Sequence, residues 1–99
     1  MYQVNHSESG DEGEFYIELE GRKAFLKYYI HRGRGVLIIM ETYTPPELRG
    51  RGIASTLMKH VLEYAKSINL KVHPLCSFAK HYIDKHPEYK ELLYGAEDT

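Results

Sequence analysis

The chain has one cysteine, no long apolar run and almost no net charge, and each shortage excludes something. Cys76 has no second cysteine with which to form an internal disulfide, which favours a reducing compartment. The longest apolar run of the first half, Val36–Met40, is far shorter than the roughly 20 residues that a membrane span needs. The opening residues, MYQVNHSESG, lack the basic and apolar regions of a signal peptide. We therefore expect a cytoplasmic protein without a membrane partner.

The balance of charge also limits the partners. The net charge is −1, and both signs are spread along the chain, which argues against a nucleic-acid partner. The Arg-Gly pairs at 32–35 and 49–52 leave RNA binding as a minor alternative. His81 and His86 are five residues apart and fall on different helix faces, and His73-x-x-Cys76 is only half of a ligand set. We expect no metal site.

A chain of 99 residues allows one domain, spanning 1–99, with one small core. The polar tail from about Gly95 is expected to be disordered. Alternating apolar residues predict paired antiparallel strands, and the run Val36–Thr44 predicts a central strand covered on both faces. The expected elements before the prolines are a short edge strand Tyr2–Asn5, a loop His6–Gly13, a strand carrying Phe15, Ile17 and Leu19, a turn Glu20–Arg22, a strand carrying Ala24, Leu26, Tyr28 and Ile30, a turn Arg32–Gly35, and the strand Val36–Thr44.

Pro45 and Pro46 offer no N–H to a sheet, so strand pairing should stop there. Three- and four-residue spacing of apolar side chains then predicts an amphipathic helix that ends at Asn69. Its inward stripe is predicted to be Ile53, Leu57, Val61, Tyr64, Ala65 and Ile68. The remaining expected elements are a strand Leu70–His73 ended by Pro74, a helix from an N-cap at Ser77 to about Lys85 with Phe78, Tyr82 and Ile83 inward, and a last helical turn from Pro87 with Tyr89, Leu92 and Leu93.

The stretch Glu41–Ser55 carries the strongest functional signal. A strand that feeds a helix through glycines leaves unpaired N–H groups at the positive end of a helix dipole, which suits an anion. Gly50 and Gly52 leave room for close approach, and two arginines add positive charge. The pattern predicts a site for a pyrophosphate group. The simpler alternative is a Gly-rich turn with no ligand.

Two better-known phosphate motifs do not fit. A dinucleotide fold would have a third glycine where Ser55 stands, and it needs several parallel strands. A P-loop needs Gly-Lys-Ser/Thr, which is absent.

The segment Arg49-Gly50-Arg51-Gly52-Ile53-Ala54, preceded by Pro46-Glu47-Leu48, resembles motif A of the GNAT acetyltransferases. The element order extends the resemblance over nearly the whole chain. Pro74–Phe78 and His86–Tyr89 look like the small, single-domain branch of that superfamily. The resemblance implies a minimal α/β (α+β) fold with a mixed, mostly antiparallel sheet of about four to five strands and two main helices. The chain departs from the usual pattern because it has loops where two acceptor-binding helices would be, and Glu41 where many small relatives have histidine.

The resemblance implies acetyl-CoA as donor co-substrate and an unknown amine as acceptor, either a small amine or a protein lysine or N-terminus. Its pyrophosphate would lie on the N–H groups of Gly50–Ala54, and its pantetheine arm would pair with Thr42–Thr44. The residues expected to bind coenzyme A are Thr42, Tyr43, Thr44, Arg49, Gly50, Arg51, Gly52, Ile53, Ala54, Ser55, Cys76 and Phe78.

Three residues are catalytic candidates. The resemblance implies that Tyr82 is a general acid; the alternative is a core tyrosine. Glu41 closes an apolar run and, by period-two counting, shares a face with Leu37 and Ile39, so partial burial would raise its pKa and suit a base; the alternative is a structural ion pair.

Cys76 precedes a helix N-terminus, which stabilises a thiolate, and His73 is near in sequence. The cysteine is interpreted either as a covalent nucleophile or as a thiol that positions the CoA sulfur, and otherwise as a small buried apolar residue. The leading hypothesis is therefore an acetyl-CoA-dependent N-acetyltransferase. The alternative is a coenzyme A-binding module without turnover.

Overall fold

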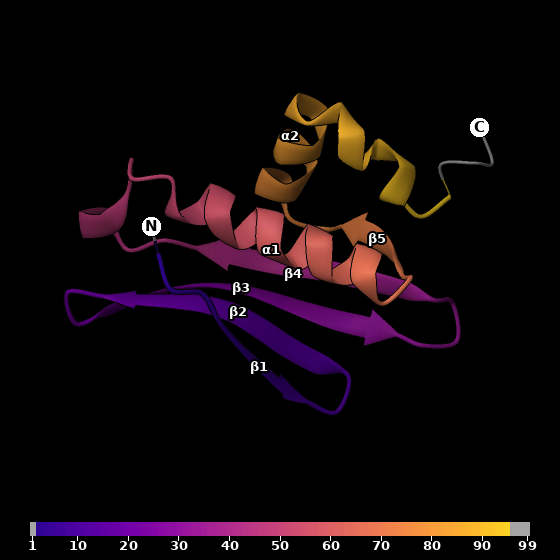
Figure 1. Ribbon diagram of the computed structural model, residues 1–99, viewed down its shortest axis with the longest axis horizontal. Coiled ribbons are helices and arrows are strands. Elements are labelled where there is room, and N and C mark those ends of the chain that lie inside the picture. The colour runs from indigo at the N-terminus through magenta and orange to yellow at the C-terminus, as the bar shows by residue number, and fades with distance from the viewer. Residues whose placement is uncertain (1, 96–99) are drawn as a thin grey trace.

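The computed structural model describes residues 2–95 and contains one mixed sheet with helices packed on it (Figure 1). The polar tail expected to be disordered lies beyond Gly95 and so outside the described residues. The elements are β1 (Asn5–Ser9), β2 (Glu12–Leu19), β3 (Arg22–His31), β4 (Val36–Tyr43), the 3-10 turn η1 (Pro46–Leu48), α1 (Ile53–Ser67), β5 (Lys71–Pro74), α2 (Ser77–Lys85) and the 3-10 segment η2 (Pro87–Leu92).

The sheet has five strands in the order β1-β2-β3-β4-β5. The first four are antiparallel neighbours, and β5 pairs with β4 in parallel after the crossover through α1. Both helices lie on one face of the sheet, and no described helix covers the opposite face, called here the open face (Figure 1). The predicted fold class, a mostly antiparallel sheet with two main helices, is confirmed.

The N-terminal prediction is wrong. An edge strand exists, but it is Asn5–Ser9 rather than Tyr2–Asn5, and the expected loop His6–Gly13 is mostly strand. The chain reverses at Gly10, whose φ of 63° favours glycine. The polar side chains of β1 resemble a loop in sequence because an edge strand exposes most of its surface.

The core lies between the helices and the covered face of the sheet. Strand alternation places Ile17 of β2 and Leu26 of β3 inward, each at most 1% exposed. Helix α1 contributes the opposite wall. The buried members of that wall are Ile53, Leu57, Met58, Val61, Leu62 and Ala65.

The inward face of α1 was predicted only in part. Met58 and Leu62 are fully buried although they were not in the expected stripe, and Ile68 is 40% exposed. The predicted stop at Asn69 is confirmed: its φ is 62°, and the N–H groups of Asn69 and Leu70 bond back to the carbonyls of Lys66 and Ala65. This pair of bonds satisfies the last carbonyls of the helix.

Strand β4 is central but not covered on both faces, because α1 and α2 lie on one side only. A bulge also interrupts it: Tyr28 pairs with Ile39 and Lys27 with Glu41, so Met40 has no partner on β3. The extra residue reverses the alternation that follows it. Glu41 therefore shares the open face with Lys27 and not, as predicted, the covered face of Leu37 and Ile39.

The C-terminal elements follow the prediction closely. Cys76, not Ser77, is the N-cap of α2, with an extended backbone and no side-chain cap bond. Tyr82 and Ile83 face inward, while Phe78 is half-buried. Segment η2 buries Tyr89 and Leu92. Among residues 2–95, no helix combines the length and the apolarity needed to cross a membrane.

Candidate active site

Strands β4 and β5 separate after the last of their four residue pairs, Ile39 and Pro74. The N–H groups of Leu75 and Cys76 both bond to the Ile39 carbonyl, and the chain then turns into α2. Strand β4 continues to Tyr43 with no strand described beside it on that edge. The separation leaves a gap between the end of β4 and the start of α2.

The segment that follows β4 has the glycine conformations and the uncapped helix start that the anion-site prediction requires. Gly50 and Gly52 have φ of 78° and 76°, a conformation that L side chains rarely adopt, and a Cβ at either position would meet no other atom within 4 Å. Helix α1 has no side-chain cap. Its first backbone bond runs from the N–H of Thr56 to the carbonyl of Gly52. The N–H groups of residues 53–55 thus have no partner within the helix.

A hollow of about 220 Å³ lies at this helix end. Thr44 is one of its lining residues, and the Thr44 hydroxyl oxygen is buried with no hydrogen-bond partner among the described residues. A buried polar atom without a partner is costly unless a bound group satisfies it. The hollow is lined by Thr44, Leu48, Arg49, Gly50, Gly52, Ile53, Ala54, Ser55 and Phe78.

Most of the residues expected to bind coenzyme A thus lie around one hollow. Leu48 is the lining residue that the sequence reasoning missed, and it is fully buried. The signal available in the sequence was that Leu48 is an apolar residue inside an otherwise polar turn. Thr42, Tyr43, Arg51 and Cys76 do not line the hollow; Thr42 and Cys76 meet instead at the gap beyond Ile39.

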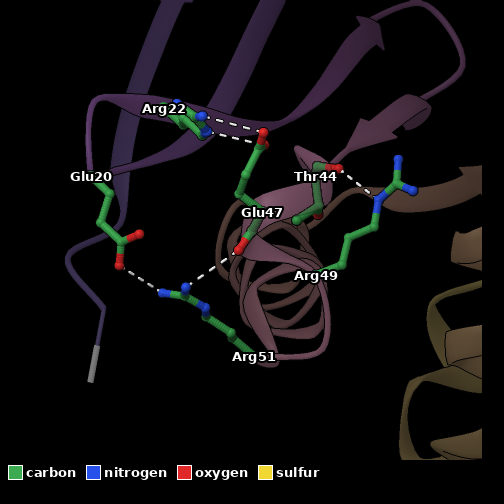
Figure 2. Close-up of polar contacts among 6 residues, drawn as sticks. All are labelled: Glu20, Arg22, Thr44, Glu47, Arg49 and Arg51. Carbon is green, nitrogen blue, oxygen red and sulfur yellow. Dashed lines mark hydrogen bonds and ion pairs between the residues drawn. The ribbon is translucent and has the colours of Figure 1, made fainter.

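The two arginines of the motif have different surroundings (Figure 2). Arg49 donates through Nε to the Thr44 carbonyl at 3.0 Å and lines the hollow. Arg51 turns to the other side, where it pairs with Glu20 at 2.8 Å and donates to the Glu47 carbonyl at 3.3 Å. The hydrogen bond and charge of Glu20 raise the pKa of Arg51, and the same pair lowers the pKa of Glu20. Arg51 therefore fixes the turn rather than facing the hollow.

A second ion pair fixes the 3-10 turn η1. Arg22 of β3 holds both carboxylate oxygens of Glu47, at 3.0 and 3.2 Å (Figure 2). Its hydrogen bond is the main reason why the pKa of Glu47 is lowered. Both pairs tie the segment Glu47–Arg51 to the β2–β3 hairpin.

Cys76 and Thr42 face each other across the gap beyond Ile39. The Cys76 sulfur lies 3.6 Å from the Thr42 hydroxyl, and both side chains are half-buried. No contact joins His73 to Cys76 among the described residues. His73 instead pairs in register with Ile38 and is exposed on the open face.

Tyr82 lies in an aromatic group. Its ring stacks on His86, with centroids 3.9 Å apart, and contacts Phe78 and Tyr89. Burial, then the charges of Glu88 and Glu63, raise the pKa of Tyr82. The phenol is held in its protonated form, which a general acid requires. These neighbours belong to α1, α2 and η2, with His86 at the junction of α2 and η2, and no described contact joins Tyr82 to Cys76.

Glu41 is exposed and lines a separate hollow of about 290 Å³ next to the bulge. The burial on which its predicted role as a base relied is absent. Met40, Lys27 and Tyr29 line the same hollow as Glu41. Among residues 2–95, no group of three or more His, Cys, Asp or Glu side chains is arranged to hold a metal ion.

The family model of the GCN5-related N-acetyltransferases matches residues 14–92, which include the hollow, the gap and the aromatic group. The chain belongs to the GCN5-related N-acetyltransferase family. It is accordingly an acyltransferase of the N-acetyltransferase type.

Individual relatives agree with this family. The chain is 31% identical to Protein NATD1 of Gallus gallus over 96 residues, covering 92% of this chain and 84% of the relative. It is 32% identical to Protein NATD1 of Homo sapiens over 85 residues, covering 81% and 74%. The solution structure of a GCN5-like protein from Staphylococcus aureus superposes with a TM-score of 0.69 at 29% identity, covering 95% of this chain and 91% of that one. The predicted membership of the GNAT superfamily and the predicted small, single-domain form of its fold are confirmed.

Proposed function

We propose that this enzyme transfers an acetyl group from acetyl-CoA to an amine. The observation that carries the proposal is the hollow at the start of α1, with its buried, unpaired Thr44 hydroxyl. Free N–H groups and Arg49 supply positive potential there, which fits a diphosphate. Ser55 and Phe78 complete the wall.

The acyl arm would extend from the hollow along the open edge of β4. Pantetheine carries amides, and the backbone of Thr42–Thr44 offers them a strand edge that β5 does not occupy. This direction leads from the hollow toward the gap where Thr42 and Cys76 lie. The thioester would then sit beside the bulge, where the backbone of Met40 lacks a partner on β3.

The transfer forms a C–N bond and breaks a C–S bond, so the amine must lose a proton and the sulfur must gain one. An amine that approaches from the open face meets Glu41 next to the bulge, and we propose Glu41 as its base. Tyr82 is the proposed acid for the sulfur because burial keeps its phenol protonated. Cys76 is proposed to hold the sulfur through the Thr42–Cys76 contact rather than to form an acyl adduct, since no base contacts its thiol among residues 2–95.

Calorimetry with two matched ligands tests the proposal. Acetyl-CoA should bind and raise the melting temperature, whereas S-acetyl-pantetheine, which has the same arm without the diphosphate, should bind at least about 100-fold more weakly. Equal affinity would show that the hollow does not bind the diphosphate. Thiol release from acetyl-CoA with a panel of amines and peptides then tests turnover, and binding without acceleration by any acceptor would favour a coenzyme A-binding module.

A further inference from the structure

The open face of the sheet carries a second hollow at the end opposite the anion-binding turn. It measures about 400 Å³, a volume that suits a small ligand. The β3–β4 turn and β5 meet there, at the end of α1 that lies farthest from its N-terminus (Figure 1). The hollow is lined by His31, Arg34, Val36, Ile38, His73 and Tyr94.

Strand register explains why these residues meet. His31 of β3 pairs with Val36 of β4, and Ile38 pairs with His73 of β5, so the four side chains point to the same face. Val36 is buried and Ile38 is half-buried, which makes the floor apolar. Tyr94 reaches this edge because its N–H bonds to the carbonyl of Val72.

The polar groups of this wall are hydrogen-bond donors. The backbone N–H of Arg34 lies 3.2 Å from both the carbonyl oxygen and Nδ1 of His31, and a neutral His31 ring that accepts at Nδ1 carries its proton on Nε2 and donates from there. The Arg34 guanidinium has no ion-pair or hydrogen-bond partner among the described residues. Its neighbour Arg32, in the same turn, pairs with Asp11 at 2.7 Å.

Among residues 2–95, no carboxylate lines the hollow. Donors and positive charge above an apolar floor are complementary to an anion attached to an apolar group. We propose that this hollow, named here the β5-end site, binds a small molecule that carries a carboxylate or phosphate on an apolar body. The site is separate from the proposed acetyl-CoA site and does not depend on it.

The test is a backbone-amide NMR titration of the full chain with benzoate, compared with benzyl alcohol, which has the same ring without the charge. Benzoate should shift the signals of residues 31–36, 71–73 and 94, and benzyl alcohol should bind at least tenfold more weakly. Shifts confined to residues 49–55 would overturn the proposal, because they would place the anion at the start of α1.

Two arginines of one turn provide matched variants. Arg34→Gln should weaken benzoate binding about tenfold or more, the scale of a lost charge-assisted hydrogen bond. Arg32→Gln should leave the affinity within about twofold, because that side chain pairs with Asp11. Equal losses in both variants would indicate a general charge effect and refute the site.

His73 lines the hollow but lies outside that turn. His73→Gln should also weaken benzoate binding, and an unchanged affinity would exclude His73 from the site.

Discussion

The Cys76 sulfur and the Thr42 hydroxyl lie 3.6 Å apart across the gap where β4 and β5 separate. The residues are 34 positions apart in sequence and are brought together because the Ile39 carbonyl accepts the N–H groups of Leu75 and Cys76. We propose that the thioester of acetyl-CoA lies beside this pair of side chains.

Cys76→Ala should lower kcat/KM for acetyl transfer about five- to tenfold, the scale of one lost hydrogen bond. Thr42→Val should have a similar effect, and the double variant should cost little more than either single one, because both changes remove the same contact. Cys76→Ser should keep most of the activity. Mass spectrometry decides whether the thiol positions the CoA sulfur or acts as a covalent nucleophile. An acetyl adduct on Cys76, together with a fall in kcat/KM of more than about 1,000-fold in Cys76→Ala, would establish the covalent route instead.

Arg49 and Arg51 should differ in their effect on coenzyme A affinity. Arg49 lines the hollow, so Arg49→Gln should raise the Kd for acetyl-CoA about tenfold in calorimetry. Arg51→Gln should change that Kd less, because its side chain is paired with Glu20. A larger loss in Arg51→Gln would mean that the diphosphate binds on the other side of the turn.

Tyr82→Phe tests the proposed general acid. If the phenol protonates the sulfur, kcat should fall about 100-fold while the Kd for acetyl-CoA changes little. The matched control is Tyr89→Phe, which removes the 2.7 Å bond to Glu63 from the same aromatic group. That control should lower the melting temperature but not kcat. Comparable kcat values for both variants and the parent enzyme would make Tyr82 a core residue only.

The Glu8 carboxylate should contribute to the way in which the free energy of unfolding falls at acid pH. The hydroxyl of Tyr64, then that of Tyr28, donate to its carboxylate and lower its pKa from 4.5. A lowered pKa means that this contribution is present above the ordinary value and is lost as pH falls through the folded-state value. Glu8→Gln should cost roughly 1 kcal/mol at pH 7, a figure reduced for solvent screening because the Glu8 side chain is 42% exposed, and progressively less as the pH falls through the lowered pKa of Glu8.

Urea unfolding at several pH values measures this difference for Glu8. The comparison variant is Glu18→Gln, an exposed strand residue with no described hydrogen bond of its side chain. If both variants show the same pH dependence, the bonds from the two tyrosines do not stabilise the fold.

Gly13 is required by packing rather than by its backbone angle. A Cβ there would lie 2.3 Å from the ring of Tyr28, which is almost fully buried. Gly13→Ala should therefore destabilise the fold by about 1–3 kcal/mol in urea unfolding. Gly33→Ala places its Cβ 3.4 Å from His31 and should stay within about 0.5 kcal/mol. Equal stability of the two variants would show that the ring moves freely.

The sequence alone was sufficient for features set by neighbouring residues. Period-two alternation predicted β2 and β3, the positive φ that Asn69 tolerates predicted the end of α1, and the glycine spacing predicted the start of α1. Apart from Leu48, the residues lining the hollow at that helix end were predictable for the same reason. They follow one another along a strand, a turn and a helix, and Phe78 was added by family resemblance.

The tertiary structure decided what depends on distant partners. The bulge at Met40 moves Glu41 to the open face, and nothing in the local pattern marks it because it arises from pairing with β3. The sequence of β1 by itself indicates a loop, and its strand conformation depends on pairing with β2. Arg49 and Arg51 are equivalent in the sequence, and they differ because Glu20, 31 positions away, holds only one of them. Contacts of this kind exist only after the chain has folded, since loop closure, not local preference, brings the partners together.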